Sequence, residues 1–299
     1  MNKVTPQELK ERLAWSLPQK IDHSLSVIEA ALKFSDNNAF VSFSGGKDST
    51  ILLFLARIVK PDMQGVFFNT TNEFPEICNF VRNTDNVLWI NPNTNLKKVI
   101  EKYGFPLVSK EQALYIREAR TTKSKKLYDK RLGSGVGSIS HKWRFLLNVD
   151  FDVSEMCCQY LKKGPSHLYQ KETKSLPIIG SSVEESLLRW EQYIRRGCNA
   201  FEDNHPASYP LSIWTQKDKW DFIHENNIPY CELYDKGMDR TDCMICGFGC
   251  QHDSRFELLK KLHPKVYQYG MNLENHGVKY GTAIRMIQKG PYKGIFDEY

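Results

Sequence analysis

A glycine-rich turn between an apolar strand and an apolar helix constrains the fold of this 299-residue chain more than any other feature. Residues 39–43 predict a short strand and residues 49–59 a buried helix, and the turn S-G-G-K-D-S joins them at 44–49. Paired glycines let the backbone bend sharply and bring main-chain N–H groups close to an anion. The positive end of the helix dipole points to the same place. The turn therefore predicts an oxyanion-binding site at a strand–helix junction.

The side chains of this turn suit the phosphates of a nucleotide. Lys47 adds a positive charge, and Ser44 and Ser49 add hydroxyl donors. The spacing differs from the G-x-x-x-x-G-K-[ST] of the Walker P-loop, which excludes that class of nucleotide hydrolase. The string instead resembles the pyrophosphate-binding loop of the N-type ATP pyrophosphatases and of the adenylyl-sulfate and phosphoadenylyl-sulfate (PAPS) reductases. We take Lys47 and Asp48 as candidate catalytic residues, and the predicted phosphate-binding residues are Ser42, Ser44, Gly45, Gly46, Lys47, Asp48 and Ser49.

This resemblance implies an α/β fold of the Rossmann-like, adenine nucleotide alpha hydrolase-like kind, in which a parallel sheet carries helices on both faces. Apolar segments at 65–69, 87–90 and 177–180 predict further strands, which alternate with helical segments as such a sheet requires. A capping box formed by Thr215 and Asp218 predicts the start of a later helix. We expect a helical N-terminal cap over 1–38, a PAPS reductase-like nucleotide-binding domain with an iron–sulfur site over 39–260, and a helical C-terminal extension over 261–299.

Two further segments resemble the reductase family, each with departures from its pattern. After the second strand the family has D-T-G, whereas this chain has Asn69 and Thr71 in place of the aspartate and the glycine. Asn69 is nevertheless a candidate nucleotide ligand. Residues 180–189 resemble the pattern G-x-R-x-x-x-S-x-x-R, which implies phosphate or sulfate contacts from Gly180 and Arg189. We predict that a helix follows over 183–196. Ser182 stands where that pattern has arginine, so one expected contact is missing.

Four of the eight cysteines have the spacing of metal ligands. Cys157 and Cys158 are adjacent, and Cys243 and Cys246 form a C-x-x-C turn. Four thiolates can hold zinc or a [4Fe–4S] cluster, but zinc sites usually combine two C-x-x-C turns, so the adjacent pair favours the cluster. The adenylyl-sulfate reductases resemble this chain in their Cys-Cys and C-x-x-C set, which there carries a [4Fe–4S] cluster.

Other residues near these motifs bear on the same site. Lys162 and Lys163 follow the adjacent pair and would place positive charge beside a cluster. Cys250 is open to three roles, as a spare ligand, a sulfur carrier or a bystander. The isolated cysteines are expected in the core, as most lone cysteines are: Cys78, Cys198 and Cys231.

Positive charge is concentrated in one segment, although the whole chain carries only +6. Residues 97–131 hold eleven lysines and arginines against four acids, and a basic helical stretch over 103–132 ends in the glycine-rich run 133–138. Such a segment is either a solvated helix face or a surface for nucleic acid. No apolar run approaches the roughly 20 residues of a membrane span, and the N-terminus has no apolar signal core. We therefore expect a cytoplasmic protein with no membrane partner.

Three functions fit these observations. A reductase of adenylyl sulfate or PAPS needs the cysteine that its family carries in a C-terminal E-C-G-[IL]-H tail, and no cysteine follows Cys250 in this sequence. We favour an ATP pyrophosphatase-type enzyme that adenylates a nucleic acid with Mg²⁺-bound ATP and then inserts sulfur from a donor protein such as a cysteine desulfurase. The reductase is the alternative, and a non-catalytic nucleotide-sensing module is the second alternative.

Overall fold

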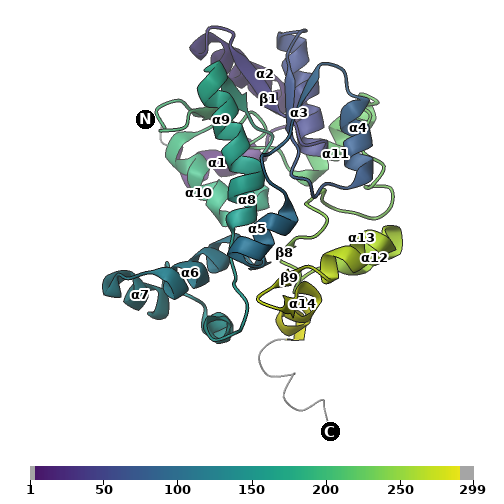
Figure 1. Cartoon of the computed structure of the whole chain (residues 1–299). Coiled ribbons are helices and arrows are strands. Elements are labelled where there is room, and N and C mark those ends of the chain that lie inside the picture. Colours follow the sequence, from purple (N-terminus) through teal and green to yellow (C-terminus); the bar gives the residue numbers. More distant parts are fainter. Residues whose placement is uncertain (1–3, 290–299) are drawn as a thin grey trace. The chain divides into compact units, whose positions relative to one another are not determined.

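The computed structural model describes residues 4–289, which form two compact units (Figure 1). The first unit comprises the chain up to Asn69 together with Phe74–Asn91 and Pro165–Thr241. The second comprises Thr70–Glu73, Pro92–Gly164 and the chain from Asp242 onward. The domain boundaries expected after residues 38 and 260 remain a prediction. Residues 1–3 of the expected cap and 290–299 of the expected extension lie outside the described residues.

A six-stranded sheet organises the first unit, with the strand order β3-β2-β1-β5-β7-β6. Paired strands are parallel except β6, which is antiparallel to β7 at the edge. The chain proceeds from β1 to β3 in one direction and resumes at β5 on the other side of β1. Such a reversal leaves a crevice outside the carboxyl ends of β1 and β5. The expected parallel α/β sheet is confirmed, with these strands: β1 (Ala39–Ser42), β2 (Gly65–Phe68), β3 (Val87–Ile90), β5 (Leu176–Ile178), β6 (Asn199–Ala200) and β7 (Ala207–Ser208).

Helices cover both faces of this sheet (Figure 1). Phe40 packs on one face against Tyr169 of α9, with ring centroids 5.1 Å apart. On the other face the ring of Phe43 lies 6.3 Å from that of Phe80 in α4, and α2 and α3 pack together. Phe43 directly follows β1 and lies three residues after Phe40, and this odd separation along extended chain places the two rings in different layers. The α-helices of this unit are α1 (Pro6–Leu13), α2 (Leu17–Phe34), α3 (Lys47–Val59), α4 (Pro75–Arg82), α9 (Gly164–Thr173), α10 (Leu187–Arg196) and α11 (Gln216–Glu225).

Capping residues decide where two helices of this unit begin. The predicted capping box is confirmed, since the Asp218 amide donates to Thr215 Oγ1 and the Thr215 amide donates to Asp218 Oδ2. The helix predicted over 183–196 is wrong at its start. Residues Val183–Glu185 form a separate 3₁₀ turn, η3, and Ser186 is extended and caps α10 through a hydrogen bond from the Arg189 amide. A serine that caps a helix cannot also continue the turn before it.

The second unit is largely helical and contains two small sheets, β4 with β8 and β9 with β10. The basic helical stretch predicted over 103–132 is wrong at residues 104–109, which contain the strand β4, and the remainder is divided because Ser124 caps a new helix. The glycine-rich run 133–138 follows α7 and is held against it by a hydrogen bond, which the Arg131 guanidinium donates to the carbonyl of Gly137 at 2.5 Å. None of the helices between residues 4 and 289 is both long and apolar enough to cross a bilayer. The elements are α5 (Leu96–Tyr103), β4 (Leu107–Val108), α6 (Lys110–Thr121), α7 (Lys125–Leu132), η1 (His141–Leu147), α8 (Met156–Cys158), η2 (Gln159–Lys163), β8 (Gly247–Phe248), α12 (Arg255–Leu262), α13 (Pro264–Met271), β9 (Glu274–Asn275), β10 (Val278–Lys279) and α14 (Tyr280–Lys289).

Candidate functional site

The glycines of the loop after β1 are required by backbone conformation and close packing. Gly45 has a φ of +73°, which side chains with a Cβ rarely adopt. A Cβ on Gly46 would lie 2.6 Å from Thr241 Oγ1. Gly180 follows β5, and a Cβ there would lie only 2.8 Å from the carbonyl oxygen of Asp48. The two predicted glycine-containing turns therefore meet where the strand order reverses.

The serines close the loop onto the first turn of α3. The Ser44 amide donates to Ser49 Oγ at 3.1 Å, and Ser49 Oγ donates to the Gly46 carbonyl at 2.9 Å. Lys47 is the first residue of α3, and Ser42 is the last residue of β1. The amides of a first helical turn have no acceptor within the helix, so they can donate to a side chain or to an anion. The predicted phosphate-binding residues of this loop are thus brought together, while their contact with phosphate remains a prediction.

Two lysines flank the carboxylate of Asp48. Lys219 of α11 places Nζ 2.6 Å from Asp48 Oδ2, and Lys47 Nζ lies 3.3 Å from Oδ1. Lys219 also donates to Ser182 Oγ at 3.0 Å and is completely buried. The sequence reasoning missed Lys219. A signal was available, because Lys219 precedes Phe222 and Ile223 by three and four residues, which places it on the buried face of α11.

Tyr234 is a second residue of this site that sequence reasoning missed. Its hydroxyl accepts a hydrogen bond from the Lys47 amide at 2.9 Å, and its ring centroid lies 5.4 Å from Lys47 Nζ. Burial raises the pKa of Tyr234, so the hydroxyl stays protonated and can also donate. Because 187 residues separate the two partners, no local pattern could have indicated the contact.

The two outlying nucleotide candidates of the first unit occupy different positions. Arg189 lines a pocket that begins at the turn after β5, together with Ser181, Ser182, Gln192, Arg196 and Tyr209. Asn69 follows β2, and its Nδ2 donates to Asn91 Oδ1 at 2.8 Å. Arg189 is thus next to the Gly180 turn, whereas Asn69 links the ends of β2 and β3. Their roles as nucleotide ligands stay predictions.

The four predicted cysteine ligands all lie in the second unit. Cys157 and Cys158 share a hydrogen bond in α8, which continues into the π-helical turn η2. The hydrogen bond with Cys158, burial and the neighbouring thiols Cys246 and Cys243 all raise the pKa of Cys157. Among the residues that the structure describes, no three Cys, His, Asp or Glu side chains stand at distances that suit one metal ion. Four thiols are a soft donor set, and an adjacent pair with one C-x-x-C turn differs from the two C-x-x-C turns usual for zinc, so a [4Fe–4S] cluster stays the prediction for this set.

Lysines supply positive charge to these thiols. The hydrogen bond from Cys157 lowers the pKa of Cys158 to about 6, assisted by the charges of Lys110, Lys162 and Lys163. The negative charge of Cys243 raises the pKa of Lys162 despite the opposing effect of desolvation. Lys162 as a whole residue is exposed, so this interaction concerns its ammonium end. A cationic surrounding of this kind suits a polyanionic cluster.

The segment after β2, which matches the reductase family only in part, holds the backbone of the C-x-x-C turn by hydrogen bonds. The Met244 amide donates to the carbonyl of Asn72 at 2.8 Å, and the Ile245 amide donates to Asn72 Oδ1 at 3.1 Å. Thr70 Oγ1 lies 3.7 Å from Cys243 Sγ. Asn72 is 4% exposed, so its side chain has a structural role that the sequence alone did not reveal. The residues Thr70–Glu73 thus fix the backbone that presents two of the thiols.

The remaining cysteines are mostly core residues. Cys198 and Cys231 are buried, as predicted, while Cys78 is half-buried. Cys250 is 1% exposed, and burial raises its pKa to about 11. A buried thiol with a raised pKa is a poor nucleophile.

Arginines and lysines of the basic segment have different surroundings. Arg117 pairs with Glu155 at 2.6 Å, and Arg131 pairs with Glu118 at 2.5 Å. Arg120 pairs with Asp152 at 3.3 Å. These arginines therefore stabilise the second unit. The lysines of the segment are exposed, both at Lys97, Lys98, Lys102 and Lys110 and in the α6–α7 hairpin at Lys123, Lys125, Lys126 and Lys130.

The chain is similar to several known proteins. An uncharacterized protein of Methanocaldococcus jannaschii, MJ0973, is 27% identical over 82% of this chain, which spans only 50% of that relative. An adenosine 5'-phosphosulfate reductase of Lysinibacillus sphaericus is 25% identical over 75% of this chain and 79% of its own length. A solved PAPS reductase of Candida auris superposes with a TM-score of 0.45 and 16% identity, covering 80% of this chain and 96% of that one.

A family model matches most of the chain. The model for the phosphoadenosine phosphosulfate reductase domain matches residues 38–248. That range contains the phosphate loop, the turn after β5 and all four candidate cysteine ligands. The chain therefore belongs to the phosphoadenosine phosphosulfate reductase domain family.

Proposed function

We propose that this protein binds ATP at residues 44–49, adenylates an oxygen of a nucleic acid and then exchanges that oxygen for sulfur. The observation that carries the proposal is the position of Lys47 and its loop at the strand reversal, in contact with the turn at Gly180. A polyanion bound there would meet the dipole of α3 and its first amides. The loop suits the end of a nucleotide that departs as pyrophosphate.

The first step is attack by a substrate oxygen on the α-phosphorus of ATP. The bond from that phosphorus to the bridging oxygen breaks, and pyrophosphate leaves with the electron pair. Lys47 and the loop amides stabilise the charge that develops on the leaving group. Asp48 Oδ1 is buried and accepts no hydrogen bond from the described residues, so it is suited to a hard cation such as Mg²⁺. Sulfide-level sulfur then attacks the carbon that bears the adenylated oxygen, the carbon–oxygen bond breaks, and AMP departs with that oxygen.

The cysteine set gives the second unit a place in this scheme. Cys157, Cys158, Cys243 and Cys246 would hold the [4Fe–4S] cluster, and a bound cluster would supply a soft site that accepts or braces sulfide. The chain's own residues orient that site, since Asn72 fixes the C-x-x-C turn and Lys162 adds a cation. The sulfur would come from a donor of the persulfide-carrying class, such as a cysteine desulfurase, and a thiol reductant would cleave the S–S bond of that persulfide, so that sulfide is released, the donor cysteine returns to a thiol and the reductant is oxidised to a disulfide.

The exposed lysines favour a nucleic acid as the substrate. The ion pairs of Arg117, Arg120 and Arg131 occupy the arginines, but the lysines of the α6–α7 hairpin present their charge to solvent. Phosphate backbones are bound by such clusters without sequence preference. A substrate rich in phosphate would therefore gain affinity beyond the nucleotide site.

Reduction of adenylyl sulfate is the alternative function, which the similarity to curated reductases favours. That chemistry needs a nucleophilic thiol besides the cluster ligands. Cys250 is the last cysteine within residues 4–289, and its burial and raised pKa argue against this role. A nucleotide-sensing module, the second alternative, would bind ATP without forming a product.

The products formed by anaerobically purified protein separate the three functions. With Mg²⁺-ATP and either transfer RNA or duplex DNA, we expect pyrophosphate and an adenylated nucleic acid, and AMP once a sulfur donor is added. Lys47→Ala should abolish the release. Thioredoxin-dependent sulfite release from adenylyl sulfate, without pyrophosphate from ATP, would establish the reductase instead. Tight ATP binding with neither product would indicate a sensing module.

A further inference from the structure

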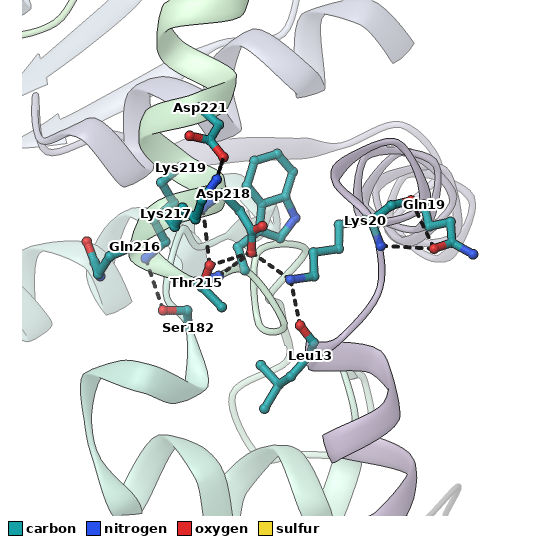
Figure 2. A network of polar contacts seen from close by, with 12 residues as sticks. Leu13, Gln19, Lys20, Ser182, Thr215, Gln216, Lys217, Asp218, Lys219 and Asp221 are labelled. Carbon is teal, nitrogen blue, oxygen red and sulfur yellow. Dashed lines mark hydrogen bonds and ion pairs between the residues drawn. The ribbon is translucent and has the colours of Figure 1, made fainter.

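Lys219 is a buried lysine that the proposed chemistry does not yet use. Its side chain has no exposed surface, and its Nζ contacts Asp48 Oδ2 at 2.6 Å and Ser182 Oγ at 3.0 Å. A buried ammonium is strongly unfavourable unless a carboxylate and hydrogen-bond acceptors surround it. The ion pair with Asp48 and the hydrogen bond to Ser182 therefore offset the cost of burying this ammonium. Figure 2 shows the first turn of α11, from which Lys219 extends.

The contacts of Lys219 change the net charge at the loop 44–49. Lys47 and Asp48 alone would cancel, because Lys47 Nζ lies 3.3 Å from Asp48 Oδ1 and both side chains are largely buried. With Lys219 the site holds two cations and one anion. The shorter contact belongs to Lys219, whose hydrogen bond goes to Oδ2, whereas Oδ1 accepts no hydrogen bond from the described residues. The pairing leaves a net charge of +1 at the loop, on the lysine that begins α3.

We infer that Lys219 is a positioning residue that neutralises Asp48 and so keeps Lys47 available for phosphate. The inference rests on the phosphate site of the proposed function and names the residue that sets the charge of that site. The contact with Ser182 extends this role to the turn after β5. Position 182 is serine here and arginine in the motif that this segment resembles, so α11 brings a cation to a junction whose own cation is missing.

Inorganic pyrophosphate without magnesium tests this inference in isolation, because it probes only the anion site. Titration calorimetry on the full chain would compare the wild type with Lys219→Met and with the double variant Asp48→Asn, Lys219→Met. We expect Lys219→Met to bind pyrophosphate at least about tenfold more weakly, since Asp48 then pairs with Lys47. The double variant has lost the carboxylate as well, so Lys47 is free again and affinity should return to within about threefold of wild type.

One further variant, Lys47→Ala, separates failure of the inference from failure of the proposed function. If Lys47→Ala binds pyrophosphate as the wild type does, the loop is not the phosphate site. If Lys219→Met binds like the wild type, or if the double variant stays as weak as Lys219→Met, Lys219 does not act through Asp48. Should Lys219→Met fail to fold, the double variant still decides, because a tenfold loss in it overturns the inference.

Lys20 provides the matched control. It is also a buried lysine, and its Nζ donates to Asp218 Oδ2 at 2.6 Å and to the Leu13 carbonyl at 2.9 Å (Figure 2). Lys20→Met therefore removes an equivalent ion pair from the same unit without changing the charge beside Asp48. We expect a lower melting temperature with pyrophosphate affinity unchanged. An equal loss of affinity in Lys20→Met would show that buried charge in general, and not Lys219, supports binding.

Discussion

The hydroxyl of Tyr234 accepts a hydrogen bond from the Lys47 amide at 2.9 Å, so a residue near the end of the first unit caps the helix that follows the phosphate loop. This amide is one of those that a helix offers to an anion. In the nucleotide-free protein the tyrosine therefore satisfies a donor that the proposed ligand would otherwise occupy. Ligand binding and the tyrosine contact compete for the same hydrogen.

Replacing Tyr234 by phenylalanine removes this competitor and keeps the ring beside Lys47. We expect the free energy of unfolding of the first unit to fall by about 1 kcal/mol, the usual worth of one hydrogen bond. Pyrophosphate affinity should be unchanged or higher. Thermal denaturation and calorimetry measure the two effects. A tenfold loss of affinity would mean that the hydroxyl donates to the bound phosphate.

Asn72 should control how well the second unit retains iron. Asn72→Ala leaves the buried Ile245 amide without its acceptor, which costs about 1–3 kcal/mol and loosens the C-x-x-C turn. Asn72→Asp keeps the Oδ1 acceptor and serves as the matched control. Iron content after anaerobic purification should fall in the first variant and stay near wild type in the second. Equal iron in all three proteins would contradict this role.

The cysteine set itself predicts a brown protein with roughly four irons per chain. Serine at any one of the four ligand positions should bleach it, whereas Cys250→Ser should keep both iron and colour, because Cys250 is not one of the four predicted ligands. Iron analysis and visible absorption measure this directly. A colourless wild-type protein with one zinc would keep the ligands but reject the cluster.

Local sequence patterns were sufficient for the fold class and for the strand–turn–helix arrangement of residues 39–59. Apolar segments fixed the positions of β1, β2 and β3 to within a residue, because buried parallel strands are short apolar runs. Thr215 was predicted correctly as a cap, since a capping box is read within four residues. The error at Ser186 has the same local origin, because a serine three residues into a predicted helix can also start a new one.

The residues missed by sequence reasoning act over long distances in the chain. Lys219 meets Asp48 across 171 residues, and Asn72 meets Ile245 across 173. The residues around one partner of such a pair give no information about the other partner, so these contacts can be identified only in the folded chain. The resemblance to a family predicted the residues that the family's motifs contain. It could not predict Lys219, whose role depends on the charge of this particular loop.

His23 should make the first unit less stable in acid. Burial lowers the pKa of His23, and the nearby Arg12 lowers it further, while Cys198 Sγ lies 3.5 Å from its Nε2. The unfolded chain then binds the proton more tightly than the folded one, so the stability due to neutral His23 is complete above pH about 6.5 and is lost as the pH falls below it.

The His23→Gln variant cannot take up this proton. Its free energy of unfolding should therefore depend less steeply on pH below about 6.5 than that of the wild type. His141 is exposed, so His141→Gln is the control and should keep the wild-type slope. Urea denaturation at a series of pH values gives the slopes. Parallel curves for His23→Gln and the wild type would contradict the prediction.

The exposed lysines of the α6–α7 hairpin should carry the salt dependence of nucleic-acid binding. Each phosphate that a lysine neutralises contributes about 0.9 to the slope of log affinity against log salt for duplex DNA. Changing Lys123, Lys125, Lys126 and Lys130 to glutamine should therefore reduce that slope by up to about 3–4 and weaken binding of all sequences alike. The control changes four exposed lysines of the first unit to glutamine, Lys10, Lys33, Lys171 and Lys174. Fluorescence anisotropy with a labelled duplex between low and moderate salt measures both slopes. If the two quadruple variants lose affinity equally, general charge and not this hairpin attracts the nucleic acid.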